Sequence, residues 1–154
     1  MASPNDGPIL ELLDLQVPAT IDGMESVHAT LANCWSALQR SRSLESRWRD
    51  EFTLAVAEVA ANIIQHAHDS ETPLVQFALS LTRYPDRLVA RFVDRGVMAT
   101  PPGMQVMPSV EMSFADLGER GRGLALVQAT TDRFEYQRTR DGKNVWVIEK
   151  YFPE

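Results

Sequence analysis

The sequence predicts an α+β fold, a two-layer α/β sandwich in which helices cover one face of a mixed, mostly antiparallel sheet. Two pairs of alternating apolar segments are each separated by a tight turn, which indicates two β-hairpins. Helical periodicity is confined to segments outside these hairpins. Hairpin-linked strands with segregated helices are typical of an α+β domain and not of a doubly wound nucleotide fold. The hairpin strands are expected at residues 74–82 with 88–94, and at 132–140 with 144–152.

The first part of the chain predicts a loose end, a strand and a helix. Residues 1–8 are rich in Pro, Gly, Asn and Asp, so we expect a flexible N-terminus ahead of a single domain at 9–154. The segment Ile9–Val17 lies between two prolines and alternates imperfectly, which indicates a strand. Either Thr20 or Asp22 can cap the helix that follows, whose apolar residues recur at helical spacing as far as Leu38.

A second helix is predicted from about Trp48 to about His68, with Ser46 as a candidate cap. Its apolar residues recur at spacings of three and four and form one stripe that would face the core. This stripe consists of Phe52, Val56, Val59 and Ile63. The helix is thus expected to pack its apolar side on the sheet.

The rest of the chain predicts turns, a long loop and a third helix around the hairpin strands. A turn is expected at 69–73, and a second one, with proline at its second position, joins the first pair of strands at 84–87. Residues 95–118 hold three prolines and no clear period, which is typical of a functional loop or lid. A glycine-rich turn then leads into a helix within 119–131, and Asp141-Gly142 forms the last hairpin turn.

Composition and charge narrow the classes of function. The chain has 154 residues, 44% hydrophobic and 23% charged, as in an ordinary soluble domain with one core. Its net charge of −6 disfavours direct binding to nucleic acid. The single cysteine, Cys34, allows no disulfide within the chain, and no apolar run approaches the length of a membrane span. We therefore expect a cytoplasmic protein without membrane contact.

The first candidate site is a polar line on the second helix. Glu58, Asn62 and His66 are spaced by four, so they stack about one turn apart on one side of the helix, among small alanines. A carboxylate, a carboxamide and an imidazole in line can serve as base, metal ligand and orienting group. The alternative is a solvated polar edge without chemistry.

The second candidate site follows the strand at 88–94. Asp94 at the strand end can accept a hydrogen bond from an exocyclic amine, and Gly96 would let a flat ring approach the backbone. The alternative is a plain turn, because Asp and Gly are common turn residues.

The third candidate site is the run from Gly118 to Leu124. Glycines before a helix expose backbone N–H groups, and the helix dipole favours an anion there. Arg120 and Arg122 add positive charge suited to phosphate. The alternative is the start of a helix with solvated arginines. The run matches neither the dinucleotide fingerprint nor a P-loop.

Together, the three sites resemble the Bergerat-fold (GHKL) ATPase and kinase superfamily. Glu58-x-x-x-Asn62-x-x-x-His66 is similar to its N box, Asp94-x-Gly96 to its first glycine box, and Gly121-Arg122-Gly123-Leu124 to its second glycine box. Residues from 95 to about 120 fall where the ATP lid of that family lies. Among its members, AEVAANIIQHAH and GRGLALVQATTDRFEY most resemble the anti-sigma-factor serine/threonine protein kinases of the RsbW and SpoIIAB type.

The chain departs from the family pattern in two places. Met98 stands where the first glycine box often has a further glycine. Gly142-Lys143-Asn144 stands where many relatives have a Gly-Thr turn that helps to hold adenine.

The resemblance implies a set of roles for these residues. Asn62 would supply an oxygen to Mg²⁺ and Asp94 would bind the adenine amine, with Gly96 and His66 lining the nucleotide site. Gly121, Gly123 and the neighbouring amide of Leu124 would cradle phosphate, with Arg120 or Arg122 stabilising the transferred charge. Glu58 would be the general base toward a serine or threonine hydroxyl.

The resemblance further implies a partner-switching regulator. As a kinase, it would use Mg-ATP to phosphorylate a STAS-type anti-sigma-factor antagonist, and as an anti-sigma factor it would bind a sigma factor. A homodimer is a further state that the resemblance allows. The alternative is a non-catalytic ATP-sensing module whose affinity for a partner depends on nucleotide alone.

Overall fold

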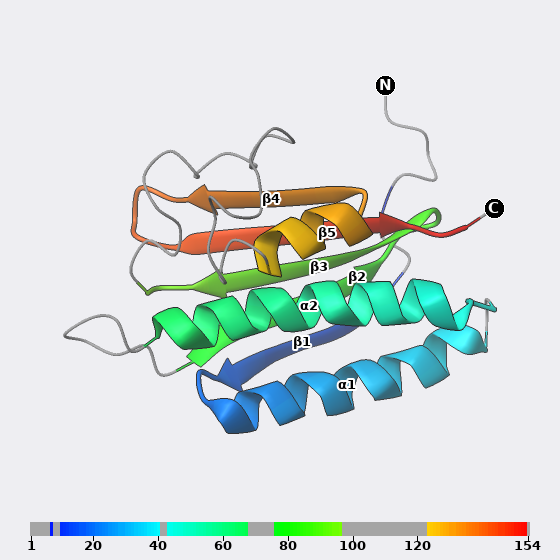
Figure 1. Ribbon diagram of the computed structural model, residues 1–154, viewed down its shortest axis with the longest axis horizontal. Coiled ribbons are helices and arrows are strands. Elements are labelled where there is room, and N and C mark those ends of the chain that lie inside the picture. Colours follow the sequence, from blue (N-terminus) through cyan, green and yellow to red (C-terminus); the bar gives the residue numbers. More distant parts are fainter. Residues whose placement is uncertain (1–6, 8–9, 41–42, 68–75, 97–122, 154) are drawn as a thin grey trace.

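One five-stranded sheet and three helices make up the part of the chain that the structure describes (Figure 1). The computed structural model describes residue 7 and residues 10–40, 43–67, 76–96 and 123–153. In order, the elements are β1 Leu10–Pro18, α1 Ile21–Gln39, α2 Ser46–His66, β2 Gln76–Arg83, β3 Arg87–Asp94, β4 Arg133–Arg138 and β5 Asn144–Tyr151. A further helix covers residues 123–130, between β3 and β4.

The sheet has the strand order β1-β2-β3-β5-β4. All four pairings between neighbouring strands are antiparallel, so the sheet contains no parallel pair among the described strands. Both predicted hairpins are present. The turn between β4 and β5 places Gly142 at a φ of 85°, where a residue with a side chain would be strained.

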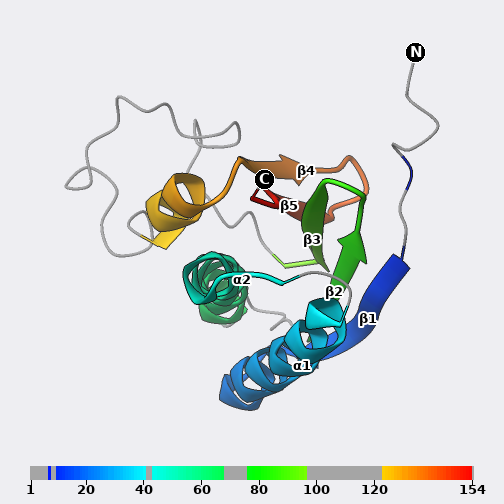
Figure 2. The same cartoon turned by 90° about the vertical axis from the view of Figure 1, so that its right-hand side faces the viewer.

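All three helices lie on one face of the sheet, which confirms the predicted two-layer α+β fold (Figure 2). Alternate residues of the strands point toward the helices, and those of β2 and β3 form much of the core. They are Phe77, Leu79, Leu81, Leu88, Ala90 and Phe92. The predicted stripe of α2 packs against them, since Phe52, Val56, Val59 and Ile63 are all buried.

The ends of the elements differ slightly from the predicted ones. Thr20 is the N-cap of α1, whereas Ser46 is the first residue of α2 and Glu45 precedes it as N-cap. The predicted turn at 69–73, most of the predicted lid at 95–120 and, except for Gly7, the predicted N-terminus at 1–8 lie outside the described residues. No helix in the described part of the chain is long and apolar enough to cross a membrane.

Candidate functional site

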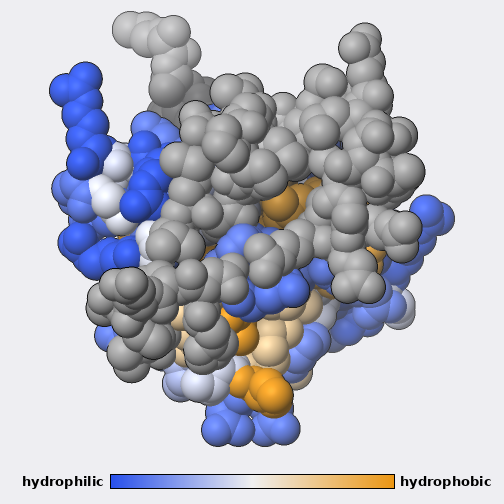
Figure 3. All heavy atoms as spheres, turned by 60° about the vertical axis from the view of Figure 1, so that its left-hand side comes forward, coloured by the Kyte–Doolittle hydropathy of each residue, from blue (hydrophilic) through white to orange (hydrophobic). Residues whose placement is uncertain are grey.

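One end of the molecule gathers the candidate site residues that the structure describes. At the left of Figure 1, both α2 and β3 end, and β5 begins beside β3. Figure 3 turns that side forward and shows hydrophobic residues in orange at the surface between hydrophilic residues in blue. The candidate residues on α2 and at the end of β3 therefore belong to neighbouring elements, although they are far apart in the sequence.

Glu58 lies against the start of the helix at 123–130. A Cβ atom added to Gly123 would lie only 2.4 Å from Oε2 of Glu58, so the carboxylate lies against the backbone at the first described residue of this helix. The N–H groups of a first helical turn have no partner within the helix and favour negative charge. Glu58 is half-buried in this position. Its carboxylate therefore packs against the described N-terminal end of a helix, and Glu58 is not a residue on a simple solvated edge.

Lys150 joins the other end of the short helix to α2, and this fixes how the two helices lie beside each other. Its Nζ donates to the carbonyl of Thr130, at the end of the short helix, over 2.6 Å, and to Oε2 of Glu51 on α2 over 2.9 Å. Glu51 and Glu58 are seven residues apart, roughly 10 Å along α2, and an eight-residue helix is about 12 Å long. The short helix thus runs antiparallel to α2, with its C-terminus tied near Glu51 and its N-terminus beside Glu58.

Asn62, one turn after Glu58, is buried with 6% of its surface exposed. Its Nδ2 has no hydrogen-bond partner among the described residues. Buried polar atoms without a partner are rare in folded proteins and call for a specific explanation, such as a ligand or ion. His66, the last residue of α2, is half-buried. The predicted polar line on α2 is thus partly or wholly buried along its length.

The described residues offer little else to a metal ion. They contain no group of three or more His, Cys, Asp or Glu side chains that could hold one. Asn62 is the described residue whose buried carboxamide fits a magnesium ion, because that ion prefers oxygen ligands and usually takes several of them from phosphates and water.

Asp94, the last residue of β3, points to the helix-covered side and is 5% exposed. Its Oδ1 accepts hydrogen bonds from Nδ2 of Asn144 at 2.8 Å and from the backbone N–H of Gly96 at 2.9 Å. Its Oδ2 accepts one from Nε1 of Trp146 at 3.1 Å. The bond to Gly96 is that of a turn, as the simpler interpretation of this segment expected, but the other two bonds join Asp94 to β5.

The contacts of Asn144 and Trp146 with Asp94 were not predicted from the sequence. Trp146 is fully buried, and its indole N–H donates to Asp94. Asn144 lies directly across from Asp94 in the pairing of β3 with β5. No local pattern reveals this register, so the sequence held no signal that would single out either residue.

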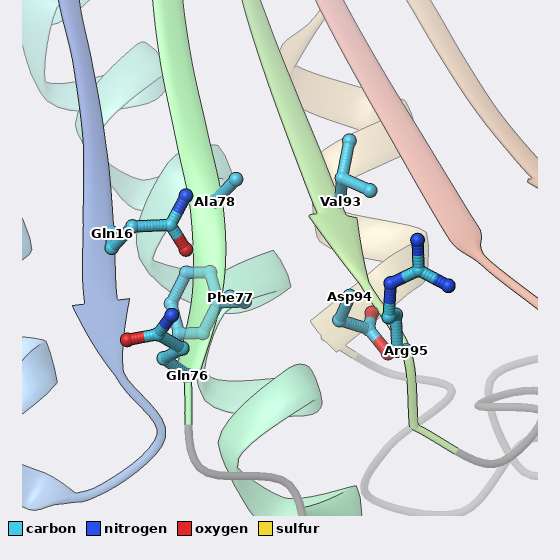
Figure 4. A pocket seen from close by; sticks show the side chains of 7 residues that line it. All are labelled: Gln16, Gln76, Phe77, Ala78, Val93, Asp94 and Arg95. Atoms are coloured by element: carbon cyan, nitrogen blue, oxygen red, sulfur yellow. The ribbon is translucent and has the colours of Figure 1, made fainter.

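A cavity of about 370 Å³ borders Asp94 from the other side. Gln16, Gln76, Ala78 and Val93 line it, and Figure 4 shows these side chains in front of the strands, with the helices behind. The cavity therefore opens on the uncovered face of the sheet. It is separate from the buried side of Asp94, where Asn144 and Trp146 lie.

The remaining predicted site residues divide into two groups. Arg120, Gly121 and Arg122 lie outside the described residues. Leu124 is 4% exposed and its side chain belongs to the hydrophobic core, so only its backbone is suited to a ligand. The structure therefore brings Glu58 to Gly123 and Asp94 to Gly96, both on the helix-covered side of the sheet.

A family model described as a histidine kinase-like ATPase domain matches residues 20–149. No curated protein matches the chain. A solved structure of the RsbU and RsbW domains of Rv1364c from Mycobacterium tuberculosis is 15% identical, with a TM-score of 0.57, and the match covers 92% of this chain and 33% of that one. The histidine kinase domain of a blue-light-activated histidine kinase from Erythrobacter litoralis EL346 is 17% identical, with a TM-score of 0.43, over 99% of this chain and 66% of that one. This chain thus spans about a third of the first neighbour, and at such identities the likeness concerns the fold.

Proposed function

This chain belongs to the histidine kinase-like ATPase domain family, and from that premise we propose that it is a serine/threonine protein kinase that also acts as an anti-sigma factor. Membership of the family implies that ATP binds. The proposal adds three things to ATP binding: a serine or threonine hydroxyl as the acceptor, a sigma factor as a partner, and an antagonist protein as the substrate.

The observation that carries the proposal is the position of Glu58. Its carboxylate lies against Gly123, at the described N-terminal end of a helix, and the backbone N–H groups at such an end can bind phosphate. A general base must lie within reach of the proton that it takes. A hydroxyl that approached a phosphate at this helix end would be beside Glu58.

Two neighbouring positions suit the two ends of ATP. Asp94 can accept a hydrogen bond from the exocyclic amine of adenine, with Gly96 leaving room for the ring. Asn62 would hold Mg²⁺ through the oxygen of its buried carboxamide. The ion would neutralise charge on the phosphates. Gly121, Leu124, Arg120 and Arg122 would complete the phosphate site, and His66 would border it.

The chain's own residues would perform three tasks in the reaction. Asp94 binds and orients the base, and the amide of Gly123 helps to hold phosphate. Glu58 takes the proton of a serine or threonine hydroxyl on the protein substrate. The hydroxyl oxygen then forms its bond to the γ-phosphorus of ATP as the bond from that phosphorus to the bridging oxygen breaks, and ADP leaves.

The partners follow from the resemblance to anti-sigma-factor kinases. The fold shared with the structure of the RsbU and RsbW domains supports this choice. The protein substrate would be a STAS-type anti-sigma-factor antagonist, and the unmodified antagonist would compete with a sigma factor for the kinase. The protein would act in the cytoplasm, as a monomer or a homodimer, without direct contact with nucleic acid.

A second function, a non-catalytic ATP-sensing module, is favoured by one observation. Among the described residues, the side-chain donors to Asp94 come from β5 and not from α2, so binding of the base would not require Glu58. Such a module would change its affinity for a partner when ATP binds and would transfer nothing.

The test is incubation with Mg-ATP and the STAS-type protein encoded nearest to it, scored by intact mass. We expect the antagonist to gain one phosphoryl group, and the variant Glu58→Gln to bind ATP normally but to transfer at least about a hundredfold more slowly. Glu45→Gln, an exposed glutamate before α2, is the matched control and should transfer at the normal rate. Unchanged transfer by Glu58→Gln would refute the assignment of the base, and ATP binding without any transfer would favour the sensing module.

A further inference from the structure

We infer that Asn144 and Trp146 are positioning residues that hold the carboxyl group of Asp94 ready for one further N–H donor, and so determine the preference for a base with an exocyclic amine. The inference rests on the proposed nucleotide site. It gives a role to Asn144 and Trp146, which have none in the proposed reaction.

The acceptor positions of Asp94 are nearly filled from within the chain. A carboxylate offers about four lone-pair positions on its two oxygens. The donors from Asn144 and Gly96 take two of them on Oδ1, and the indole of Trp146 takes one on Oδ2. No further donor from the described part of the chain takes the fourth position, on Oδ2. A single N–H group of a ligand would complete the set.

The carboxamide of Asn144 can lie in only one of its two orientations. On one side it faces two acceptors, Oδ1 of Asp94 at 2.8 Å and the carbonyl of Gly96 at 3.3 Å. On the other side it faces two donors, the hydroxyl of Tyr136 at 2.6 Å and Nη1 of Arg138 at 2.9 Å. A flipped amide would set oxygen against oxygen and nitrogen against donor. Asn144 is fully buried, so water cannot replace these bonds.

Trp146 is fixed equally firmly. Its ring is fully buried and packs on Tyr136, with ring centroids 4.4 Å apart, and on Phe134, at 6.2 Å. Its Nε1–H can only donate, so it always faces an acceptor. Together Asn144 and Trp146 prevent the carboxyl group from rotating. The lone pair that remains on Oδ2 therefore points in a fixed direction.

An acceptor held in one direction can distinguish purine bases by the group on carbon 6 of the ring. Adenine carries an amine there and can donate, whereas hypoxanthine carries a carbonyl oxygen that would face the carboxylate without a hydrogen bond. Leaving a buried charged group unpaired in this way costs about tenfold to a hundredfold in affinity. If Asn144 no longer held Asp94, this advantage of ATP over ITP would shrink.

The experiment compares ATP and ITP affinities of Asn144→Val and Asn144→Thr. Valine and threonine have nearly the same shape, but only threonine has a hydroxyl that can donate to Asp94. We expect wild-type protein to prefer ATP by about tenfold or more, Asn144→Val to lose most of that preference through weaker ATP binding, and Asn144→Thr to keep the larger share. Gln137→Val, at an exposed site on the same hairpin, should keep the wild-type ratio.

Several outcomes would overturn the inference. If Asn144→Val weakens ATP and ITP equally, the residue is merely structural. If both variants keep the wild-type ratio, Asn144 has no part in the preference. Wild-type protein that binds neither nucleotide would remove the proposed function and the inference together, whereas binding without phosphoryl transfer would remove only the kinase proposal.

A measurement on wild-type protein covers the case in which the variants do not fold. The indole N–H groups of the three tryptophans have different acceptors: Trp146 donates to Asp94, Trp35 to Oγ1 of Thr53, and Trp48 to the carbonyl of Tyr151. In an NMR titration with ATP, the indole signal of Trp146 should move furthest. Saturating ATP that leaves this signal unmoved would contradict the inference.

Discussion

Lys150 and Asn62 are both buried polar residues on the helix-covered side of the sheet, but they differ in what surrounds them. Lys150 lies beside the N-terminal half of α2 and donates to Glu51 and to the carbonyl of Thr130. Asn62 lies in the C-terminal half of α2, and its Nδ2 has no partner among the described residues. Further along α2, the carboxylate of Glu58 lies against Gly123, the first described residue of the helix at 123–130.

The same contrast holds for two buried carboxylates. Glu149 accepts hydrogen bonds from Nε of Arg87 at 3.2 Å and from Nη1 of Arg133 at 3.1 Å, so each of its oxygens has a cationic partner. Asp94, at the other end of the sheet, has three neutral donors among the described residues, which leave one acceptor position. A pair completed within the chain serves stability, whereas an incomplete set suits a ligand that is bound and released.

Two guanidinium nitrogens near the Lys150 end, Nε of Arg49 and Nε of Arg83, are also buried and form no hydrogen bond with the described residues through that atom. Both side chains make contacts through other atoms of the guanidinium group. Arg49 donates through Nη2 to Ser46, and Arg83 lies over the ring of Phe152. Because each keeps a favourable contact, these atoms do not mark a second ligand site. Substitutions at the two ends of the molecule should therefore change different quantities.

The largest effect is expected for Lys150→Met. The change leaves Glu51 and the carbonyl of Thr130 without their buried cation, which should lower the free energy of unfolding by about 3 kcal/mol. ATP affinity should stay within about twofold, because the site end is untouched. Denaturant unfolding and nucleotide titration measure the two quantities. The control Lys143→Met removes only an exposed pair with Asp141 and should change stability by less than about 0.5 kcal/mol.

Asp94→Asn should mainly change binding. The amide loses one acceptor and presents N–H groups to the donors of Asn144 and Trp146, so ATP should bind about a hundredfold more weakly. Asp86→Asn, on an exposed aspartate in the turn before β3, should leave the affinity unchanged. Equal affinities of these two variants in a fluorescent-nucleotide titration would rule out Asp94 as the base-binding residue.

Gly123→Ala should separate catalysis from stability. The added Cβ would meet only the flexible end of Glu58, so the fold is expected to tolerate it, but the displaced carboxylate should slow phosphoryl transfer about tenfold. Gly142→Ala is the opposite case. With its φ of 85° it should lose about 1 kcal/mol of stability and transfer normally. Reversed results would place Glu58 outside the reaction.

Asn62→Leu is expected to stabilise the protein while it disables the site. Leucine has a similar volume and no unpaired polar atom, so the free energy of unfolding should rise by about 1 kcal/mol. The dependence of ATP binding on Mg²⁺ should disappear. Gln65→Leu, on the exposed side of α2, serves as the control. A marked loss of stability in Asn62→Leu would show that Asn62 has an internal partner and is not kept for a ligand.

The smallest expected effect is on the stability of the protein at low pH. Hydrogen bonds from Lys150 and then from Arg47 lower the pKa of Glu51. A lowered folded-state pKa means that ionised Glu51 stabilises the fold above its usual pKa of about 4.3, and that this contribution is lost as the pH falls through the lowered value. Unfolding at neutral pH and at about pH 3 should show that Glu51→Gln reduces the loss of stability on acidification, by less than about 1 kcal/mol. Asp50→Asn, at its exposed neighbour, should lose as much as the wild type.

Much of the fold could be predicted because its signals are local. The alternation of the hairpin strands, the Asp-Gly turn and the apolar stripe of α2 each depend on residues that are close in the sequence. The same is true of the polar line of Glu58, Asn62 and His66, since helical spacing alone places these residues on one side of α2. The resemblance to a known family then connected this line with Asp94 and Gly123.

The contacts that complete the site depend on how distant elements pair and dock. The sequence by itself determined that Asp94 ends a strand and that Asn144 begins another. Only the tertiary structure decided that the two strands pair in the register that joins these residues, that Trp146 points its indole at the same carboxyl group, and that Gly123 reaches Glu58. Register and docking minimise the free energy of the whole core, and no short segment of the chain contains that information.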